Sequence, residues 1–82
     1  MPRVVLTAGL AQVYTSGETE IEVPGSNVRQ LLKALDERYP GLGEQIRESM
    51  AIAIDGEIYQ DAMFESVDDS NEIFIMPKIG GG

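Results

Sequence analysis

The apolar positions of this chain recur with two different periods, and the changes of period predict its elements. Residues 3–8 and 19–23 are rich in β-branched and aliphatic side chains, which predicts two strands separated by a turn over 9–17. In the second strand Ile21 and Val23 point to one side and three glutamates point to the other. We therefore expect a half-buried strand with a solvated acidic face rather than a metal site.

Helical periodicity follows these two strands. Ser26 is a suitable N-cap for a helix that begins at Asn27 or Val28, and Pro40-Gly41 ends it. Positions spaced by three or four residues form one apolar stripe, namely Val28, Leu31, Leu32, Leu35 and Tyr39. A further short turn of helix, anchored by Leu42 and Ile46, is expected before residue 49.

Three more strands are expected in the second half of the chain, at 50–54, 57–60 and 72–77. Asp55-Gly56 joins the first two of them, because a type I′ hairpin turn needs a positive φ at both positions. In the long connection to the last strand, we expect Phe64 and Val67 to anchor the loop in the core. Residues 68–71 form a polar turn rather than a calcium loop, because Ile73 stands where that motif requires glycine.

The last strand is apolar on both faces. Ile73 and Ile75 share one face, and Phe74 and Met76 share the other. This pattern predicts a central strand, or a strand with one face open for a partner. Phe74 and Met76 would form that open face, unless a loop covers them and makes them part of the core. The elements predict an α+β layout with one main helix on one sheet, the first two strands paired and the last strand beside the first.

The composition of the chain excludes several classes of partner and of catalytic site. The chain of 82 residues has 14 acidic and six basic side chains, which gives a net charge of −8. We therefore expect neither nucleic acid nor an anionic membrane as a partner, and favour a partner with a basic surface. Without cysteine or histidine the chain has no thiol nucleophile, no thiolate zinc site and no imidazole base. A carrier or helper is expected rather than an enzyme.

The first eleven residues have the basic-then-apolar order of a signal peptide, but their apolar run is at the short limit for one. Cleavage there would also remove the first expected strand. No run approaches the roughly 20 apolar residues of a membrane span, so we expect a cytoplasmic protein.

The chain ends in three glycines, Gly80, Gly81 and Gly82. Taken alone, this ending also fits a cloning scar or a frayed terminus, because glycine has no side chain to pack. A terminal Gly-Gly after this pattern of strands and helix is, however, what a ubiquitin-like protein needs. Its main-chain carboxylate enters a narrow site on another protein, where a Cβ would clash.

The whole chain resembles the MoaD/ThiS family of sulfur carriers. The resemblance rests on short segments spread along the chain: 4–8, Ile21-Glu22-Val23-Pro24-Gly25, Val28-Arg29-Gln30-Leu31-Leu32, Arg38-Tyr39-Pro40-Gly41-Leu42, Ile54-Asp55-Gly56-Glu57, Glu72-Ile73-Phe74-Ile75-Met76-Pro77 and the Gly-Gly end. Two positions depart from the pattern. Lys78 stands where many members have a second proline, and Asp55-Gly56 stands where Asn-Gly is common.

The resemblance implies a ubiquitin-like β-grasp fold, with a mixed four- to five-stranded sheet packed on one main helix. We expect this domain over 1–77 and a flexible tail over 78–82. The Gly82 carboxylate, preceded by Gly81, would be the reactive group. Partner docking is expected of the residues at the end of the last strand and in the tail: Phe74, Met76, Pro77, Lys78, Ile79 and Gly80.

The chemistry that the resemblance implies takes place on partners. A MoeB/ThiF-like adenylating enzyme of the ubiquitin-activating type would use ATP and Mg²⁺ to convert the carboxylate to an acyl-adenylate. A persulfide sulfur would then replace AMP and leave a thiocarboxylate, which a synthase such as a MoaE-like large subunit would accept. The chain itself would bind no cofactor or metal and would serve as the small, non-catalytic subunit.

Several functions remain open at this point. The length favours molybdopterin synthesis over thiamine synthesis, and sulfur carriers for cysteine or specialised metabolites are alternatives. A protein modifier joined through Gly82 to a lysine starts from the same acyl-adenylate, so the sequence does not separate it from a carrier. The pattern also fits a β-grasp interaction module with an accidental tail, or an enzyme that uses Asp55, Glu57 and Tyr59. For those three side chains, a solvated turn is the simpler interpretation.

Overall fold

A computed structural model describes residues 1–78. Its elements, in chain order, are β1 (Arg3–Val5), α1 (Ala8–Tyr14), β2 (Glu20–Glu22), α2 (Val28–Arg38), α3 (Leu42–Ser49), β3 (Met50–Ile54), β4 (Glu57–Tyr59) and β5 (Glu72–Pro77). The expected helical turn before residue 49 is confirmed as α3.

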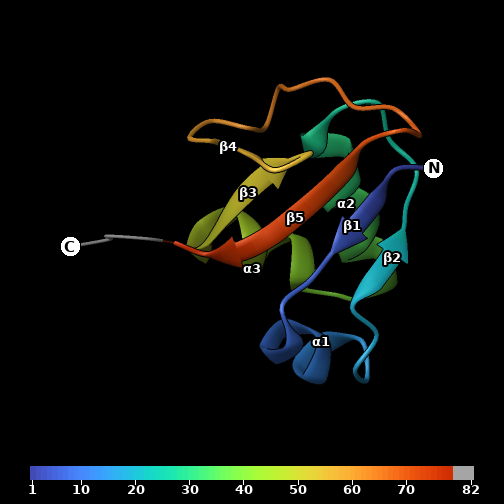
Figure 1. Ribbon diagram of the computed structural model, residues 1–82. Coiled ribbons are helices and arrows are strands. Elements are labelled where there is room, and N and C mark those ends of the chain that lie inside the picture. Colours follow the sequence, from blue (N-terminus) through green and yellow to red (C-terminus); the bar gives the residue numbers. More distant parts are fainter. Residues whose placement is uncertain (79–82) are drawn as a thin grey trace.

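The strands form one mixed sheet of five, in the order β2-β1-β5-β3-β4 (Figure 1). The last strand is central and runs parallel to β1, while every other neighbouring pair is antiparallel. The predicted α+β architecture, the pairing of the first two strands and the central last strand are all confirmed. A central position suits β5 because its apolar residues occupy both faces of the sheet.

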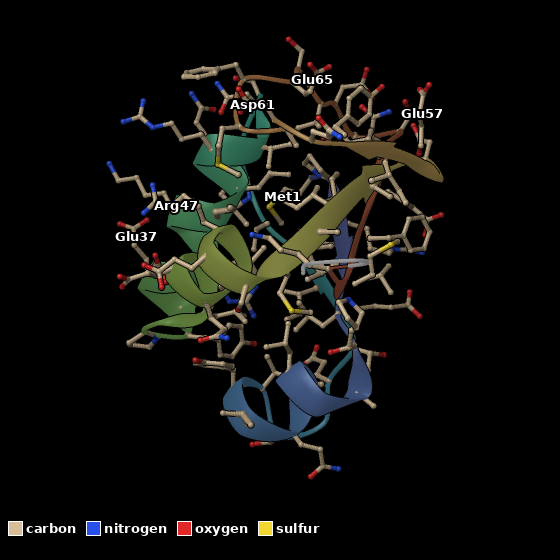
Figure 2. The ribbon with its side chains drawn as sticks, turned by 90° about the vertical axis from the view of Figure 1, so that its left-hand side faces the viewer. Met1, Glu37, Arg47, Glu57, Asp61 and Glu65 are labelled. Atoms are coloured by element: carbon tan, nitrogen blue, oxygen red, sulfur yellow. The ribbon has the colours of Figure 1, made fainter. Side chains whose placement is uncertain are left out.

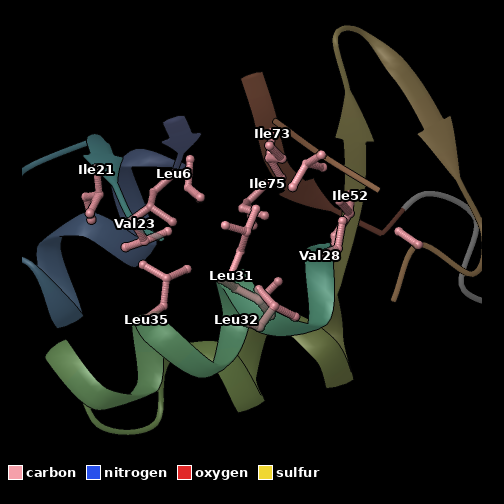
Figure 3. Packing of buried hydrophobic residues seen from close by; sticks show 14 of the residues in the cluster. Leu6, Ile21, Val23, Val28, Leu31, Leu32, Leu35, Ile52, Ile73 and Ile75 are labelled. Atoms are coloured by element: carbon pink, nitrogen blue, oxygen red, sulfur yellow. The ribbon is translucent and has the colours of Figure 1, made fainter. Parts of the chain in front are cut away.

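Helix α2 covers one face of this sheet. Leu31 and Leu35 are fully buried and point toward the sheet, where Ile75 of β5 and Val23, directly after β2, lie (Figure 3). Seen from the side in Figure 2, α2 and α3 lie on the left and the sheet lies on the right. Each fully buried Leu or Ile of this core contributes roughly 1.5–3 kcal/mol relative to exposure. The predicted apolar stripe is therefore the contact between helix and sheet.

The predicted start of α2 is right, but the predicted cap is wrong. The N-cap is Asn27, whose Oδ1 accepts the backbone N–H of Gln30 at 2.8 Å. Ser26 instead donates its own N–H and hydroxyl to Oε1 of Gln30, at 2.8 and 2.9 Å. Both residue types suit the position, and the extended backbone of Asn27, with φ −148°, places its side chain over the first turn.

The turn predicted over 9–17 contains a helix, α1, and the first strand ends earlier than expected. Thr7 is the N-cap of α1: its hydroxyl accepts the N–H of Leu10 at 3.2 Å, so the helix begins at Ala8. Ala11 is buried, so the short helix is held by packing against the core. An isolated helix of seven residues would be only marginally stable in water. The sequence predicted a turn here because Gly9 disfavours a helix.

The loop between β4 and β5 is anchored at different residues than predicted. Val67 is buried as expected, but Phe64 is 77% exposed, and the second anchor is Ala62. The carbonyls on either side of Phe64, those of Met63 and Glu65, accept hydrogen bonds from the first backbone N–H groups of α2. Because the loop backbone is turned toward the helix, the Phe64 side chain points outward.

The hairpin turn is confirmed at Asp55-Gly56, where φ is 51° and 89°. Asp55 also ties the turn to the start of β5. Its carboxylate accepts the N–H of Glu72 at 2.9 Å and the side-chain amide of Asn71 at 2.6 Å. The acid is therefore used to position the central strand.

Close packing of α3 on α2 depends on Gly43. A Cβ at this position would collide with the backbone carbonyl of Leu32 and approach the Asp36 carboxyl to 2.9 Å. We expect Gly43→Ala to lower the free energy of unfolding by about 1–3 kcal/mol, because the two helices would have to separate. Urea denaturation measures this loss, and Gly9→Ala is the matched control, since nothing lies within 4 Å of its Cβ. A Gly43→Ala protein as stable as the Gly9→Ala protein would contradict this packing.

Candidate functional site

The sheet has one face that α2 and α3 do not cover. Figure 1 views this face, with both helices behind it. The strand register places one row of residues across four strands on this side, from Val5 through Phe74 and Ala53 to Ile58. Ala53 is buried in the row because it is small and lies between Phe74 and Ile58. A continuous apolar row on an uncovered face is typical of a protein-binding surface.

We call this surface the open-face patch and define it by its five accessible apolar residues, Val5, Ala51, Ile58, Phe74 and Met76. Ile58 is 53% exposed and the other four are half-buried. Phe74 and Met76 lie opposite the buried Ile73 and Ile75, as the sequence predicts, and not in the core. Their role in docking stays a prediction.

An acidic border lies along one side of the open-face patch. Arg3 is paired across the strands with Glu22 and Glu72, and Glu20 is the cross-strand partner of Val5. The Arg3 guanidinium lies 3.3 Å from the Glu20 carboxylate and 3.6 Å from that of Glu72. These groups are about half exposed or more, so water and salt screen the pairs. One cation among three glutamates leaves negative potential here, which favours a basic partner.

The chain leaves the sheet beside the open-face patch. Pro77 ends β5 opposite Met50, and both Pro77 and Lys78 are exposed. The Lys78 ammonium donates a hydrogen bond to the Glu48 carbonyl oxygen at 3.0 Å. This carbonyl lies at the C-terminal end of α3, where helix carbonyls lack partners and attract cations. Lys78 is therefore held at the end of α3 directly after the chain leaves β5.

The remaining predicted site residues, Ile79, Gly80, Gly81 and Gly82, lie outside the described residues. The boundary between a domain over 1–77 and a tail over 78–82 stays a prediction for the same reason.

The hairpin residues considered as a carboxylate site are engaged in local bonds. The Tyr59 hydroxyl donates to the Glu57 carboxylate at 3.0 Å. This hydrogen bond and the negative charge of Glu57 raise the pKa of the Tyr59 phenol, which makes the phenolate harder to form. Asp55, as described above, holds the start of β5. Proton transfer by this group of side chains is therefore disfavoured.

The acidic turn before β5 is also locally satisfied. The Asp68 carboxylate accepts the Ser70 hydroxyl and N–H, at 2.5 and 2.8 Å, which lowers the pKa of Asp68. Asp69 pairs with the N-terminal amine of Met1 at 2.8 Å. Residues 1–78 contain no group of three or more acidic side chains arranged to hold a metal ion. Over the same residues, no helix has both the length and the apolar character needed to cross a membrane.

Sequence reasoning missed most of the open-face patch. It found Phe74 and Met76 from the alternation in one strand, but Val5, Ala51 and Ile58 join them only through the strand order and register. The signal was present in Ile58, an apolar residue in a short strand of otherwise polar or amphipathic side chains.

Comparison with known proteins decides the family. The family model described as the ThiS family matches residues 4–82. The chain belongs to the ThiS family. The predicted membership of the MoaD/ThiS sulfur carriers is thereby confirmed, and the match extends through the terminal glycines.

Individual relatives of this ThiS-family protein agree with the assignment. A molybdopterin synthase sulfur carrier subunit from Pyrenophora tritici-repentis is 27% identical over 82 residues, covering 95% of this chain and 87% of the relative. The solution structure of small archaeal modifier protein 1 from Methanosarcina acetivorans has a TM-score of 0.78 at 27% identity, covering 99% of this chain and 95% of that one.

A third similarity concerns the fold alone. A chain of the Amycolatopsis orientalis BexX/CysO complex superposes with a TM-score of 0.84 at 19% identity, with full coverage of both chains. With the modifier protein, it confirms the ubiquitin-like β-grasp fold predicted for this ThiS-family chain.

Proposed function

We propose that this protein is a sulfur carrier whose Gly82 carboxylate is adenylated by a partner enzyme and converted to a thiocarboxylate. Molybdopterin synthesis is the pathway we propose for it. The observation that carries the proposal is the extent of the ThiS-family match, which reaches Gly82 and so includes the reactive terminus. The name of the Pyrenophora relative supports the pathway.

The proposed reaction begins with a poor electrophile. The Gly82 carboxylate attacks the α-phosphorus of ATP and releases pyrophosphate, which leaves an acyl-adenylate. A persulfide of the partner attacks the acyl carbon and AMP leaves, giving an acyl disulfide. A second thiol of the partner then cleaves the S–S bond, so the thiocarboxylate is released as the partner's two sulfurs form a disulfide. ATP and Mg²⁺ belong to the partner's site, and the carrier is not itself catalytic.

What this chain supplies is positioning. Docking through the open-face patch holds Lys78 at a fixed place on the partner's surface, and the terminal glycines pass into the site without a Cβ to clash. Restricting the terminus in this way gives the reaction the advantage of an intramolecular one. We propose a MoeB/ThiF-like adenylating enzyme and a MoaE-like synthase subunit as the partners that use this surface in turn, since both must reach the same terminus.

A second candidate function is protein modification. The likeness to small archaeal modifier protein 1, at 27% identity, favours it. In that case the amine of a target lysine attacks the acyl-adenylate, AMP leaves and an isopeptide bond forms with loss of a proton. Both functions require the same activated Gly82 and the same docking surface. Sulfur delivery for the synthesis of thiamine or cysteine is a third candidate.

Exchange of labelled pyrophosphate into ATP tests the shared first step. The purified chain and a MoeB/ThiF-like enzyme are mixed with ATP, Mg²⁺ and labelled pyrophosphate. We expect exchange that depends on this chain, because only reversible acyl-adenylate formation returns the label to ATP. If the enzyme activates another carrier of the same cells and leaves this chain unmodified, the proposal is wrong.

A further inference from the structure

A groove of ≈ 430 Å³ lies on the outer side of α2 and α3, away from the sheet. We call it the helix-side groove; the residues that matter for its chemistry are Arg29, Lys33, Asp36, Arg47 and Met63. Figure 2 shows Arg47 on the side of the molecule opposite the sheet. Arg47 and Met63 also line a second pocket, which reaches Ala51, Ile58 and Lys78 at the edge of the sheet.

The groove concentrates positive charge in an acidic protein. Three of the six basic side chains, Arg29, Lys33 and Arg47, line it, although the chain carries a net charge of −8. Within residues 1–78, no carboxylate lies within 4 Å of these three cations. Arg29 and Lys33 are also one helical turn apart, where like charges cost about 0.2–0.5 kcal/mol. Such a cluster is electrostatically complementary to an anionic partner.

The acids near the groove do not cancel this charge. The Asp36 carboxylate lines the groove but accepts the backbone N–H groups of Gly43 and Glu44, at 2.7 and 3.3 Å. It thus serves the start of α3. Glu37 lies farther along the same side of the molecule (Figure 2). Among the residues that line the groove, three are cations and one, Asp36, is a carboxylate that already has hydrogen-bond donors.

An apolar rim accompanies the charge. Met63 lines the groove, and its carbonyl oxygen accepts the Arg29 N–H at 3.0 Å. Phe64, the next residue, is therefore held beside Arg29, and it is 77% exposed. An exposed aromatic next to an arginine cluster has the composition of a protein-binding hot spot.

We infer that the helix-side groove binds an extended acidic segment of a partner protein, which also places an apolar side chain against Phe64 and Met63. Charge complementarity favours an acidic peptide over nucleic acid as the ligand. A nucleic acid is a long polyanion that the acidic remainder of the surface would repel, whereas a short acidic segment would contact the groove alone. The groove lies on α2 and α3, whereas Phe74, at the centre of the open-face patch, lies on the sheet face turned away from these helices. The inference stands whether or not Gly82 carries sulfur.

Nuclear magnetic resonance of the isotopically labelled protein tests the inference. The probe is a short synthetic peptide of alternating glutamate and leucine. We expect its shift changes to fall on the outer side of α2 and α3. Lys33→Glu is expected to weaken binding about tenfold or more, which corresponds to 1.4 kcal/mol. Phe64→Asp is expected to weaken it as well.

Arg38→Glu is the matched control, because it makes the same charge change on the same helix outside the groove. Arg38 is exposed and donates to the Glu22 carbonyl oxygen at 3.1 Å. We expect about a twofold effect or less from this long-range charge. Equal weakening by Lys33→Glu and Arg38→Glu, shift changes confined to the sheet, no binding at all, or tighter binding of single-stranded DNA than of the peptide would each overturn the inference.

Discussion

Removal of Gly82 is expected to abolish activation by the adenylating enzyme and to leave the fold intact. Without this residue the terminal carboxylate ends about 3.5 Å short of the reacting phosphorus. A misplacement of 1 Å can already cost about 10²-fold in rate. We therefore expect pyrophosphate exchange to fall by at least about 100-fold. The described core hydrophobic residues lie between Val4 and Ile75, so the urea unfolding midpoint is expected to stay unchanged.

Gly82→Ala is the companion variant, because it keeps the length of the terminus and adds only a Cβ. A strong loss of exchange in this variant would show that the partner's site needs close backbone approach at the last residue. Full activity of the shortened chain would refute the role of Gly82.

Phe74→Asp is expected to weaken binding to the adenylating enzyme by about 30-fold or more, as for a central aromatic of an interface that is worth about 2 kcal/mol. Phe74 lies in the row that crosses the open-face patch, between Val5 and Ala53. An aspartate there would place an unpaired charge against an apolar partner surface. Isothermal titration calorimetry measures the affinity, and circular dichroism reports whether the sheet is retained.

Phe64→Asp is the matched control for this experiment. It makes the same substitution at an exposed aromatic outside the open-face patch, in the loop whose backbone bonds to the start of α2. We expect it to leave the affinity for the adenylating enzyme unchanged. Equal affinities of the two variants and the unchanged protein would show that the enzyme does not dock on the open-face patch.

Local sequence patterns predicted much of the fold. The stripe of α2 predicted its buried face, Asp55-Gly56 predicted the hairpin, and the apolar residues on both faces of β5 predicted its central position. The alternation in β5 also placed Phe74 and Met76 on the face opposite Ile73 and Ile75, but it left open whether a loop would cover them. Each of these signals depends on neighbours in the sequence. The diglycine end likewise indicated the family, which the comparison then confirmed.

The features that sequence reasoning missed depend on tertiary contacts. Helix α1 contains Gly9 and is short, so its stability comes from burial of Ala11 rather than from propensity. Phe64 is exposed because the carbonyls beside it bond to the start of α2. Arg47 joins Lys33 in the helix-side groove only because α3 folds back onto α2.

The proposed sulfur transfer can be tested on the protein isolated from its native cells, by the mass of its C-terminal peptide. We predict a peptide heavier by the replacement of one oxygen by sulfur, and loss of this increment after an active sulfur acceptor is added. Gly-Gly branches on the lysines of other proteins, without any thiocarboxylate, would assign the protein to modification instead. A terminus that is always an ordinary carboxylate, in cells whose sulfur-transfer pathway is running, would contradict the proposed function.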